Sequence, residues 1–179
     1  SYKYCVLLHF LNFRINDMAR LGVFYALSDE QVDAIAEQDD DKMYAYMLNT
    51  IEENLLGTPK SYQIDKAWEG IHYCLCEGDW YKEEGIAPNI VFGGYLLLDH
   101  NDCVIFVNDL DNIQKIVDYL EENNLQEIIK KNFEKIPSDY SYTKNEEELN
   151  YLLSWSKGVL DFYKYALKNQ LNTIFTVDL

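Results

Sequence analysis

The chain has 179 residues, with 31 acidic and 15 basic side chains, a net charge of −16 and 48% hydrophobic residues. This length and apolar content predict one folded domain with its own core and exclude a disordered chain. Nucleic acids and anionic membranes are bound through clustered lysine and arginine, so the charge argues against both as partners. A strongly acidic surface suits either solubility or a basic protein partner.

The first residues precede the predicted domain. Their apolar run Tyr4–Phe13 is shorter than the roughly 20 residues that a membrane span needs, and it lacks the charged cluster and cleavage site of a signal peptide. A fresh protein start is suggested at Met18. We therefore interpret residues 1–17 as an extension, an added upstream segment or an extra edge strand, and residues 18–179 as a single domain.

Two elements open this domain. The short apolar run Leu21–Leu27 predicts a buried strand. Ser28 and Gln31 then have the spacing of a capping box, which begins an amphipathic helix. A second helix is expected over residues 39–56, and Gly57 ends it.

The middle of the chain mixes helix and strand. A third helix is expected over residues 63–77, where apolar side chains recur at helical spacing. Strands are expected at Ile90–Phe92 and Tyr95–Leu98, on either side of a turn at Gly93-Gly94. The run Val104–Val107 is either a strand or an extended lead into the next helix.

The last third is mostly helical. Helices are expected from Asn108 or Asp109 to about Glu122, over residues 125–136 and, as the longest, over residues 145–169. The β-prone run Thr173–Val177 predicts a final strand. The whole order predicts an α+β fold: a small mixed or antiparallel sheet with about six helices packed on it, including a long C-terminal helix followed by a final strand.

Four cysteines are present: Cys5, Cys74, Cys76 and Cys103. On a helix, Cys74 and Cys76 would point about 200° apart, so they neither bridge nor share a zinc ion easily. We interpret the cysteines as thiols in a reducing cytoplasm, with a disulfide or a zinc site as the alternative.

The most distinctive segment is Ile64–Tyr73, with the sequence IDKAWEGIHY. On one helix, Asp65, Glu69, His72 and Cys76 would lie along a single face. The spacing of Glu69 and His72 allows a helix to offer a carboxylate and an imidazole to one metal. Sites of that kind need a second such motif, which the sequence lacks, so we predict no metal and no cofactor.

Two interpretations of this segment stay open. In the structural one, His72 forms a local hydrogen bond at the edge of the core, Trp68 and Tyr73 belong to the core, and Gly70 permits the close approach of another element. In the functional one, His72 is an acid or base and Trp68 stacks on a ligand. The candidate residues for binding a ligand or a partner are Asp65, Lys66, Trp68, Glu69, His72, Tyr73 and Trp80.

Three parts of the chain resemble the YfbM-like family, a domain of unknown function numbered 1877. They are residues 18–31 (MARLGVFYALSDEQ), residues 64–73 and the pair Gly93-Gly94. The resemblance covers about residues 18–179. It implies a small bacterial α+β protein with no settled enzymatic activity, so it assigns no catalytic residue.

These observations favour a non-enzymatic bacterial protein-binding domain, most concretely an immunity protein that neutralises a cognate secreted toxin. An acidic surface can cover the basic active-site cleft of such a toxin and speed association. The alternative is a small-ligand binder or an enzyme that uses the segment Asp65–Tyr73. Much of the acidic charge falls at predicted helix starts, where it also interacts with helix dipoles.

Overall fold

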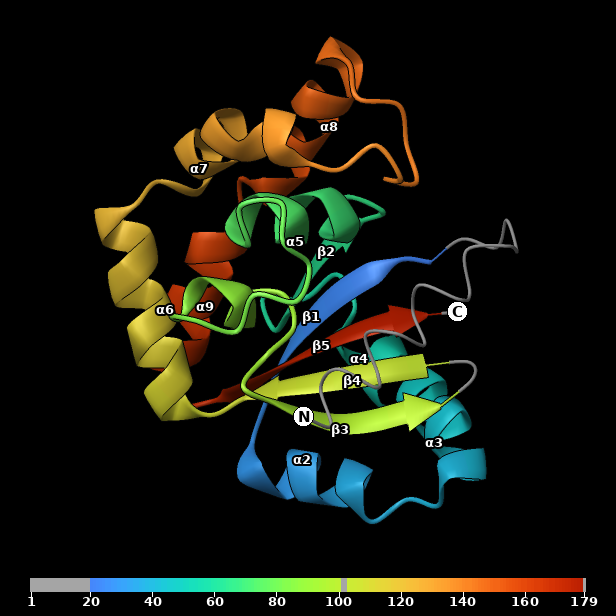
Figure 1. The fold of residues 1–179 in the computed structure, drawn as a ribbon. Helices are drawn as coiled ribbons and strands as arrows, with labels where there is room; N and C mark the ends of the chain where they lie inside the picture. The colour runs from blue at the N-terminus through green and yellow to red at the C-terminus, as the bar shows by residue number, and fades with distance from the viewer. Residues whose placement is uncertain (1–19, 101–102, 179) are drawn as a thin grey trace.

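The computed structural model describes residues 20–100 and 103–178 (Figure 1). Within these residues, five strands form one antiparallel sheet in the order β2-β1-β5-β4-β3. Its strands are β1 (Gly22–Leu27), β2 (Ser61–Asp65), β3 (Tyr95–His100), β4 (Cys103–Asn108) and β5 (Asn172–Asp178). The predicted α+β fold with a small antiparallel sheet is confirmed.

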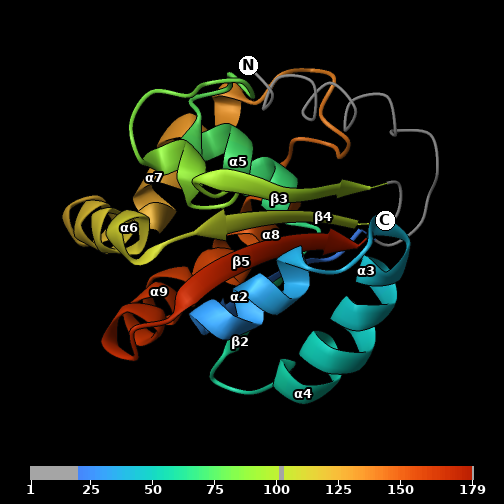
Figure 2. The ribbon, with the colours of Figure 1, turned by 90° about the horizontal axis from the view of Figure 1, so that it is seen from below.

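Helices cover both faces of the sheet (Figures 1 and 2). One layer contains α2 (Asp29–Ala36), α3 (Asp40–Tyr46), the π-helical segment Met47–Glu52 and α4 (Glu53–Leu55). The other contains α5 (Trp68–Leu75), α6 (Leu110–Glu122), α7 (Leu125–Asn132), α8 (Glu146–Ser156) and α9 (Val159–Lys168). Among the described residues, none of the helices is both long and apolar enough to cross a membrane.

Strand β1 shows why the first apolar run is continuous. Val23, Tyr25 and Leu27 pack in the smaller core beneath α2 and α3, whereas Phe24 and Ala26 pack in the larger core beneath the other helices. A strand that is buried on both faces has no position for a polar side chain. The predicted buried strand is therefore confirmed, and β1 joins the two cores.

The layer that contains α2 to α4 begins as predicted. The amide of Gln31 donates to Ser28 Oγ at 3.2 Å, and the amide of Ser28 donates to Gln31 Oε1 at 3.0 Å, which completes the capping box. The helix predicted over residues 39–56 is present as α3, the π-helical segment and α4 in direct succession.

The helix predicted over residues 63–77 begins five residues late, at Trp68. Residues 61–65 instead form the edge strand β2, which pairs with β1. Asp65 has φ 51°, a left-handed conformation that separates β2 from α5. The placement of Asp65 on one helical face with Glu69 was therefore wrong, because pairing with β1 prevailed over the local helical pattern.

The strand predicted at Ile90–Phe92 was also wrong. This run follows a 3₁₀ turn at Ala87–Asn89 and continues as turn, yet all three of its side chains are buried. The hydroxyl of Tyr163 donates to the Ile90 carbonyl oxygen, so a side chain satisfies that backbone group in place of a neighbouring strand. A run of apolar residues indicates that their side chains are buried, and residues 90–92 are buried although they do not form a strand. The run Val104–Val107 does belong to a strand, β4.

The helical range predicted over residues 145–169 is occupied by α8 and α9, which meet at Lys157-Gly158. Gly158 is needed there because a Cβ atom would stand 2.3 Å from the ring of Tyr62, and its amide donates to the Tyr62 hydroxyl at 2.9 Å. Strand β5 follows, as predicted, and lies between β1 and β4 at the centre of the sheet. The expectations for residues 1–17 and Cys5 lie outside the described residues.

Candidate functional site

The segment Ile64–Tyr73 crosses from the end of β2 into α5. Every residue of α5, from Trp68 to Leu75, is buried. The helix lies on the larger core and packs against α7 and α8. The segment is therefore a packing centre, and its polar side chains must find their partners inside the protein.

Aromatic rings surround His72 inside this core. The ring centre of His72 lies 4.7 Å from that of Trp80 and 4.5 Å from that of Phe92, both edge to face. Tyr73 lies 4.8 Å from Trp80, and Trp68 lies 5.9 Å from Phe92. Four of the predicted site residues thus meet in one aromatic cluster, but they pack on one another.

His72 is 2% exposed, and both ring edges have neighbours. Nε2 lies 3.2 Å from the carbonyl oxygen of Trp80, which can only accept, so Nε2 carries the proton. Cys76 Sγ lies 3.5 Å from the same ring. The local hydrogen bond predicted for His72 is therefore present, and the ring lies within the core.

His72 and Cys76 were predicted to share one helical face, but a contact between them was not predicted. Their spacing of four residues on a helix was the signal for that contact. A cysteine beside a histidine is the arrangement that activates a thiol for nucleophilic attack. Cys76, however, is 0% exposed. Burial also raises the pKa of the neighbouring thiol Cys74 to about 12, so Cys74 stays protonated at neutral pH.

The carboxylates of the segment form hydrogen bonds with α8 and with the chain that precedes it. Asp65 Oδ1 accepts from the Tyr151 hydroxyl at 2.6 Å and from the Lys66 amide at 2.7 Å. Glu69 is buried, and its Oε1 accepts from the hydroxyl of Ser141 at 3.0 Å. These bonds fasten β2 and α5 to residues far along the sequence, which is a structural use of both carboxylates.

Tyrosines complete a polar cluster around these carboxylates. The Tyr140 hydroxyl donates to Glu148 Oε1 at 2.6 Å. Burial, together with the charges of Glu69, Glu148 and Asp65, raises the pKa of Tyr142 to about 12. Sequence reasoning missed these residues, because the polar stretch before α8 has no periodic pattern. Among the described residues, no group of three His, Cys, Asp or Glu could hold a metal ion.

Room for a ligand at the segment is small. His72 and Trp80 line a cavity of about 10 Å³, which holds about one water molecule. Trp80 is buried, and its Nε1 has no hydrogen-bond partner among the described residues. Lys66 is only partly buried. Ligand pockets commonly occupy about 300–1,000 Å³. The burial of Trp68, Glu69, His72, Tyr73 and Trp80 therefore favours the structural interpretation of the segment.

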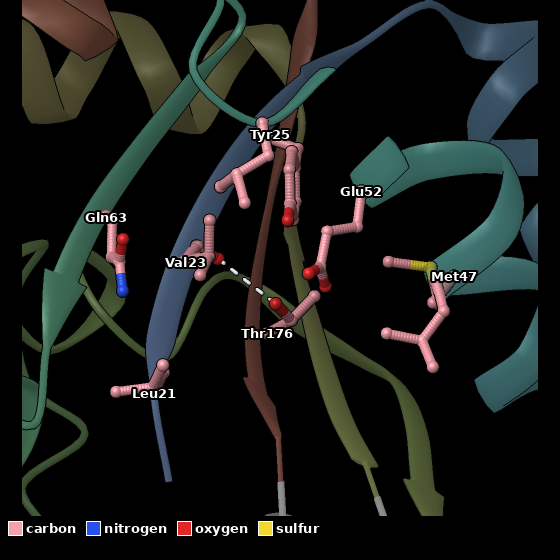
Figure 3. Close-up of a pocket in the computed structure, with 9 residues that line it drawn as sticks. Leu21, Val23, Tyr25, Met47, Glu52, Gln63 and Thr176 are labelled. Carbon is pink, nitrogen blue, oxygen red and sulfur yellow. Dashed lines mark hydrogen bonds between the residues drawn. The ribbon is translucent and has the colours of Figure 1, made fainter. Parts of the chain in front are cut away.

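Two larger hollows lie elsewhere. One of about 280 Å³ lies between α6, α7 and the loop after α5, with Lys82 and Lys131 in its wall. The other, of about 70 Å³, lies between the sheet and the π-helical segment (Figure 3). None of the seven predicted site residues lines either hollow.

Acidic charge is concentrated on one layer of helices. Residues 28–56, which form α2 to α4, carry nine acidic side chains and one basic side chain, Lys42. Residues 110–168, which form α6 to α9, carry eleven acidic and eight basic side chains. The first segment thus has a net charge of −8 and the second of −3. We call the helices of residues 28–56 the acidic layer.

Exposed tyrosines lie on and beside the acidic layer. Tyr44 belongs to α3, and Tyr95 on the edge strand β3 is 47% exposed. Partial burial raises the pKa of Tyr95, and so do the charges of Asp109, Asp33 and Asp29. Tyr95 is thus within electrostatic reach of α2.

Comparison with known proteins gives a family and a fold. Residues 18–176 match the family model described as "Domain of unknown function (DUF1877)". No curated protein matches the chain. Among solved structures, the chain is similar to the crystal structure of YfbM from Escherichia coli, a protein of unknown function. The two share 19% identity with a TM-score of 0.58, over 89% of this chain and 99% of that one, a likeness of fold alone.

Proposed function

Because this chain belongs to the DUF1877 family, whose description names no activity, we propose its function from its surface: it is a non-enzymatic domain that binds a basic protein. The observation that carries the proposal is the acidic layer. The acidic layer carries nine acidic side chains and one basic side chain, a net charge of −8. Half of the chain's net charge of −16 thus lies in 29 of its 179 residues.

Helix stability does not account for all of this charge. Asp29 and Glu30 lie in the first turn of α2, where a negative charge is favourable. Glu37 instead caps the C-terminus of the same helix, where a negative charge is unfavourable, and no basic residue lies in the last turn. The charge of Glu37 does not stabilise this helix end, and this supports a role for the charge in binding.

The exposed tyrosines add the second feature of a protein interface. Tyr44 and Tyr95 present large aromatic surfaces on and next to the acidic layer. Aromatic side chains contribute a large share of binding energy at interfaces, while surrounding charges steer the partner and speed association. This combination suits a basic protein better than a small molecule.

The most concrete form of the proposal is a bacterial immunity protein that neutralises a secreted toxin. A toxin with a basic active-site cleft offers the complementary surface. The proposal places the protein in the cytoplasm, where the buried thiols Cys74 and Cys76 stay reduced. The alternative, a ligand site or an enzyme on the segment Asp65–Tyr73, has less support because that segment packs within the core.

The test uses the products of the neighbouring genes. Each is purified and titrated against this chain by calorimetry, and its toxicity is measured with and without co-expression of this chain. We expect one basic product to bind and to lose its toxicity. If no neighbouring product binds, or if binding leaves toxicity unchanged, the proposal fails.

A matched pair of variants locates the surface. Asp33→Lys/Glu37→Lys reverses two exposed charges on the acidic layer, and Glu122→Lys/Glu134→Lys makes the same change in net charge on the other layer. We expect the first pair to slow association about tenfold or more at low salt, and the control pair to change it little. Equal effects of the two pairs would contradict the role of the acidic layer.

A further inference from the structure

A slot lies between the acidic layer and the sheet (Figure 3). Its volume is about 70 Å³. Its apolar wall is formed by Leu21, Val23, Met47, Leu48 and Leu56, and its polar groups belong to Tyr25, Glu52, Gln63 and Thr176. Among the described residues that line it, the slot therefore combines an apolar wall with a single carboxylate, that of Glu52.

The polar groups are gathered at one place in the slot. In Figure 3, the Glu52 carboxylate and the Thr176 hydroxyl extend from opposite walls toward the same space. Thr176 Oγ1 donates to the Val23 carbonyl oxygen at 3.3 Å, which leaves its lone pairs to accept. A carboxylate has about four acceptor positions, so Glu52 can take a further donor in addition to its contacts within the chain.

The π-helical segment is what brings Met47 and Glu52 to the slot together. In an α-helix, residues five apart point about 140° away from each other. The i→i+5 hydrogen bonding of a π-helix turns such residues to the same side, and the segment runs from Met47 to Glu52. An irregular helix thus places a flexible apolar side chain beside a carboxylate, and π-helical turns are frequent at functional sites.

The size of the slot selects its occupant. At roughly 10–15 Å³ for each water-sized atom, the volume admits about five to seven non-hydrogen atoms. A lysine side chain consists of a stem of methylene groups and one ammonium, and it falls at the lower end of this range. At the mouth of the slot, Leu56 is 45% exposed, which provides an apolar contact for the start of such a stem.

We propose that the slot receives one lysine side chain of the basic partner, with its methylene stem along Met47 and Leu56 and its ammonium at Glu52 and Thr176. The inference rests on the proposed function, since the acidic layer brings the basic partner to this edge of the sheet. Lysine fits better than arginine because a compact ammonium on a flexible stem needs no bidentate carboxylate geometry.

The first test uses n-butylammonium, which reproduces the lysine side chain, and needs no partner protein. The chain has three methionines, Met18, Met43 and Met47. Since Met47 lines the slot, its signal in methyl NMR of ¹³C-labelled methionine reports on binding there. We expect the Met47 methyl signal to shift and saturate, while that of the buried Met43 stays in place. Neutral n-butanol should bind more weakly than n-butylammonium, by a factor of about ten or more.

Two variants show whether Glu52 receives the ammonium. Glu52→Gln should weaken the binding of n-butylammonium about tenfold, and Glu53→Gln, a change at the exposed first residue of α4, should leave the binding unchanged. An unaltered Met43 signal shows that each variant is folded. Absence of a saturable Met47 shift, equal binding of n-butanol, or equal binding to Glu52→Gln would each overturn the inference.

A third arm tests the source of the amine. Nα-acetyl-lysine methylamide, which keeps the side-chain ammonium, should bind as n-butylammonium does. The arginine side-chain analogue n-propylguanidinium should bind more weakly. If the lysine derivative does not bind, the occupant is not the lysine of a protein. If the guanidinium binds more tightly than the ammonium, the choice of lysine over arginine is wrong. These outcomes are separate from the proposed function, which is read from partner binding and from the Asp33→Lys/Glu37→Lys pair.

Discussion

Gly70 lies where α5 meets α8 and the chain before it. A Cβ atom at this position would stand 2.5 Å from the Tyr140 hydroxyl oxygen and 2.7 Å from Leu152 Cδ1. These distances are far below van der Waals contact, so a side chain would push α5 away from α8. The close approach that the glycine predicted is confirmed, and packing explains why a glycine stands at a helical position where it costs about 1 kcal/mol of stability relative to alanine.

Gly70→Ala should lower the free energy of unfolding by about 1–3 kcal/mol, because overpacking outweighs the better helix propensity of alanine. Urea unfolding measures the change. Tyr140→Phe removes the nearest atom, so the double variant should lose less than the sum of the two single losses. Strict additivity would show that the Tyr140 hydroxyl is not the obstacle.

His72 is a second residue whose role is testable by stability. Its ring touches Trp80, Phe92 and Cys76 within the aromatic cluster. His72→Ala should therefore lower the free energy of unfolding by about 2–4 kcal/mol, as for other large buried side chains. Urea unfolding again gives the value. A variant as stable as the parent chain would argue against the packing role and reopen the ligand interpretation.

At the scale of elements, the junction of β2 and α5 depends on Asp65. Its φ of 51° is a conformation that asparagine tolerates and alanine does not favour. Its carboxylate also accepts from Tyr151 and from the Lys66 amide. The side chain therefore offsets the backbone strain that its own position imposes.

The structure predicts an order of stability at position 65. Asp65→Asn keeps the acceptor oxygen and the conformation and should cost less than about 1 kcal/mol. Asp65→Ala loses both and should cost about 2–3 kcal/mol. Thermal unfolding of both variants checks the order. Equal losses would show that the left-handed conformation and the two hydrogen bonds contribute little.

Element prediction succeeded where local pattern and tertiary environment agree. The capping box at Ser28 and the helix over residues 110–122 were predicted correctly, because caps and amphipathic periodicity act within a few residues. Residues 63–65 were predicted as helix but belong to β2, because a partner distant in sequence pairs with them. Burial alone made Ile90–Phe92 resemble a strand.

At the scale of the whole molecule, the net charge of −16 is unevenly placed. The sequence alone left open whether the acids would be spread or gathered. The fold gathers half of the net charge on the acidic layer, because α2 to α4 together cover one face of the sheet (Figure 2). The case for a basic partner is therefore stronger than composition alone makes it.

Tyr142 predicts how the whole molecule responds to alkali. Partial burial and the nearby carboxylates Glu69, Glu148 and Asp65 raise the pKa of Tyr142 from 10.0 to about 12, so the phenol keeps its proton to higher pH in the folded chain than in the unfolded chain. The stability from this group is fully present below pH 10 and is lost as the pH rises toward 12.

The free energy of unfolding should therefore fall steadily between about pH 10 and pH 12. Urea unfolding across this range, with tyrosine ionisation followed by absorbance, measures the effect. Tyr142→Phe should make the fall shallower, and Tyr46→Phe on α3 serves as the control. A pH dependence identical in Tyr142→Phe and the parent chain would contradict the assignment.

The sequence by itself determined the α+β class, most of the helices and the role of Gly70, because caps, periodicity and glycine act through neighbouring residues. Only the tertiary structure decided where the segment Ile64–Tyr73 packs and what its polar groups contact, because their partners lie up to 86 residues away. The acidic layer shows both contributions. The sequence of residues 28–56 determines how many charges the layer carries, but their position on one face depends on how α2 to α4 pack on the sheet.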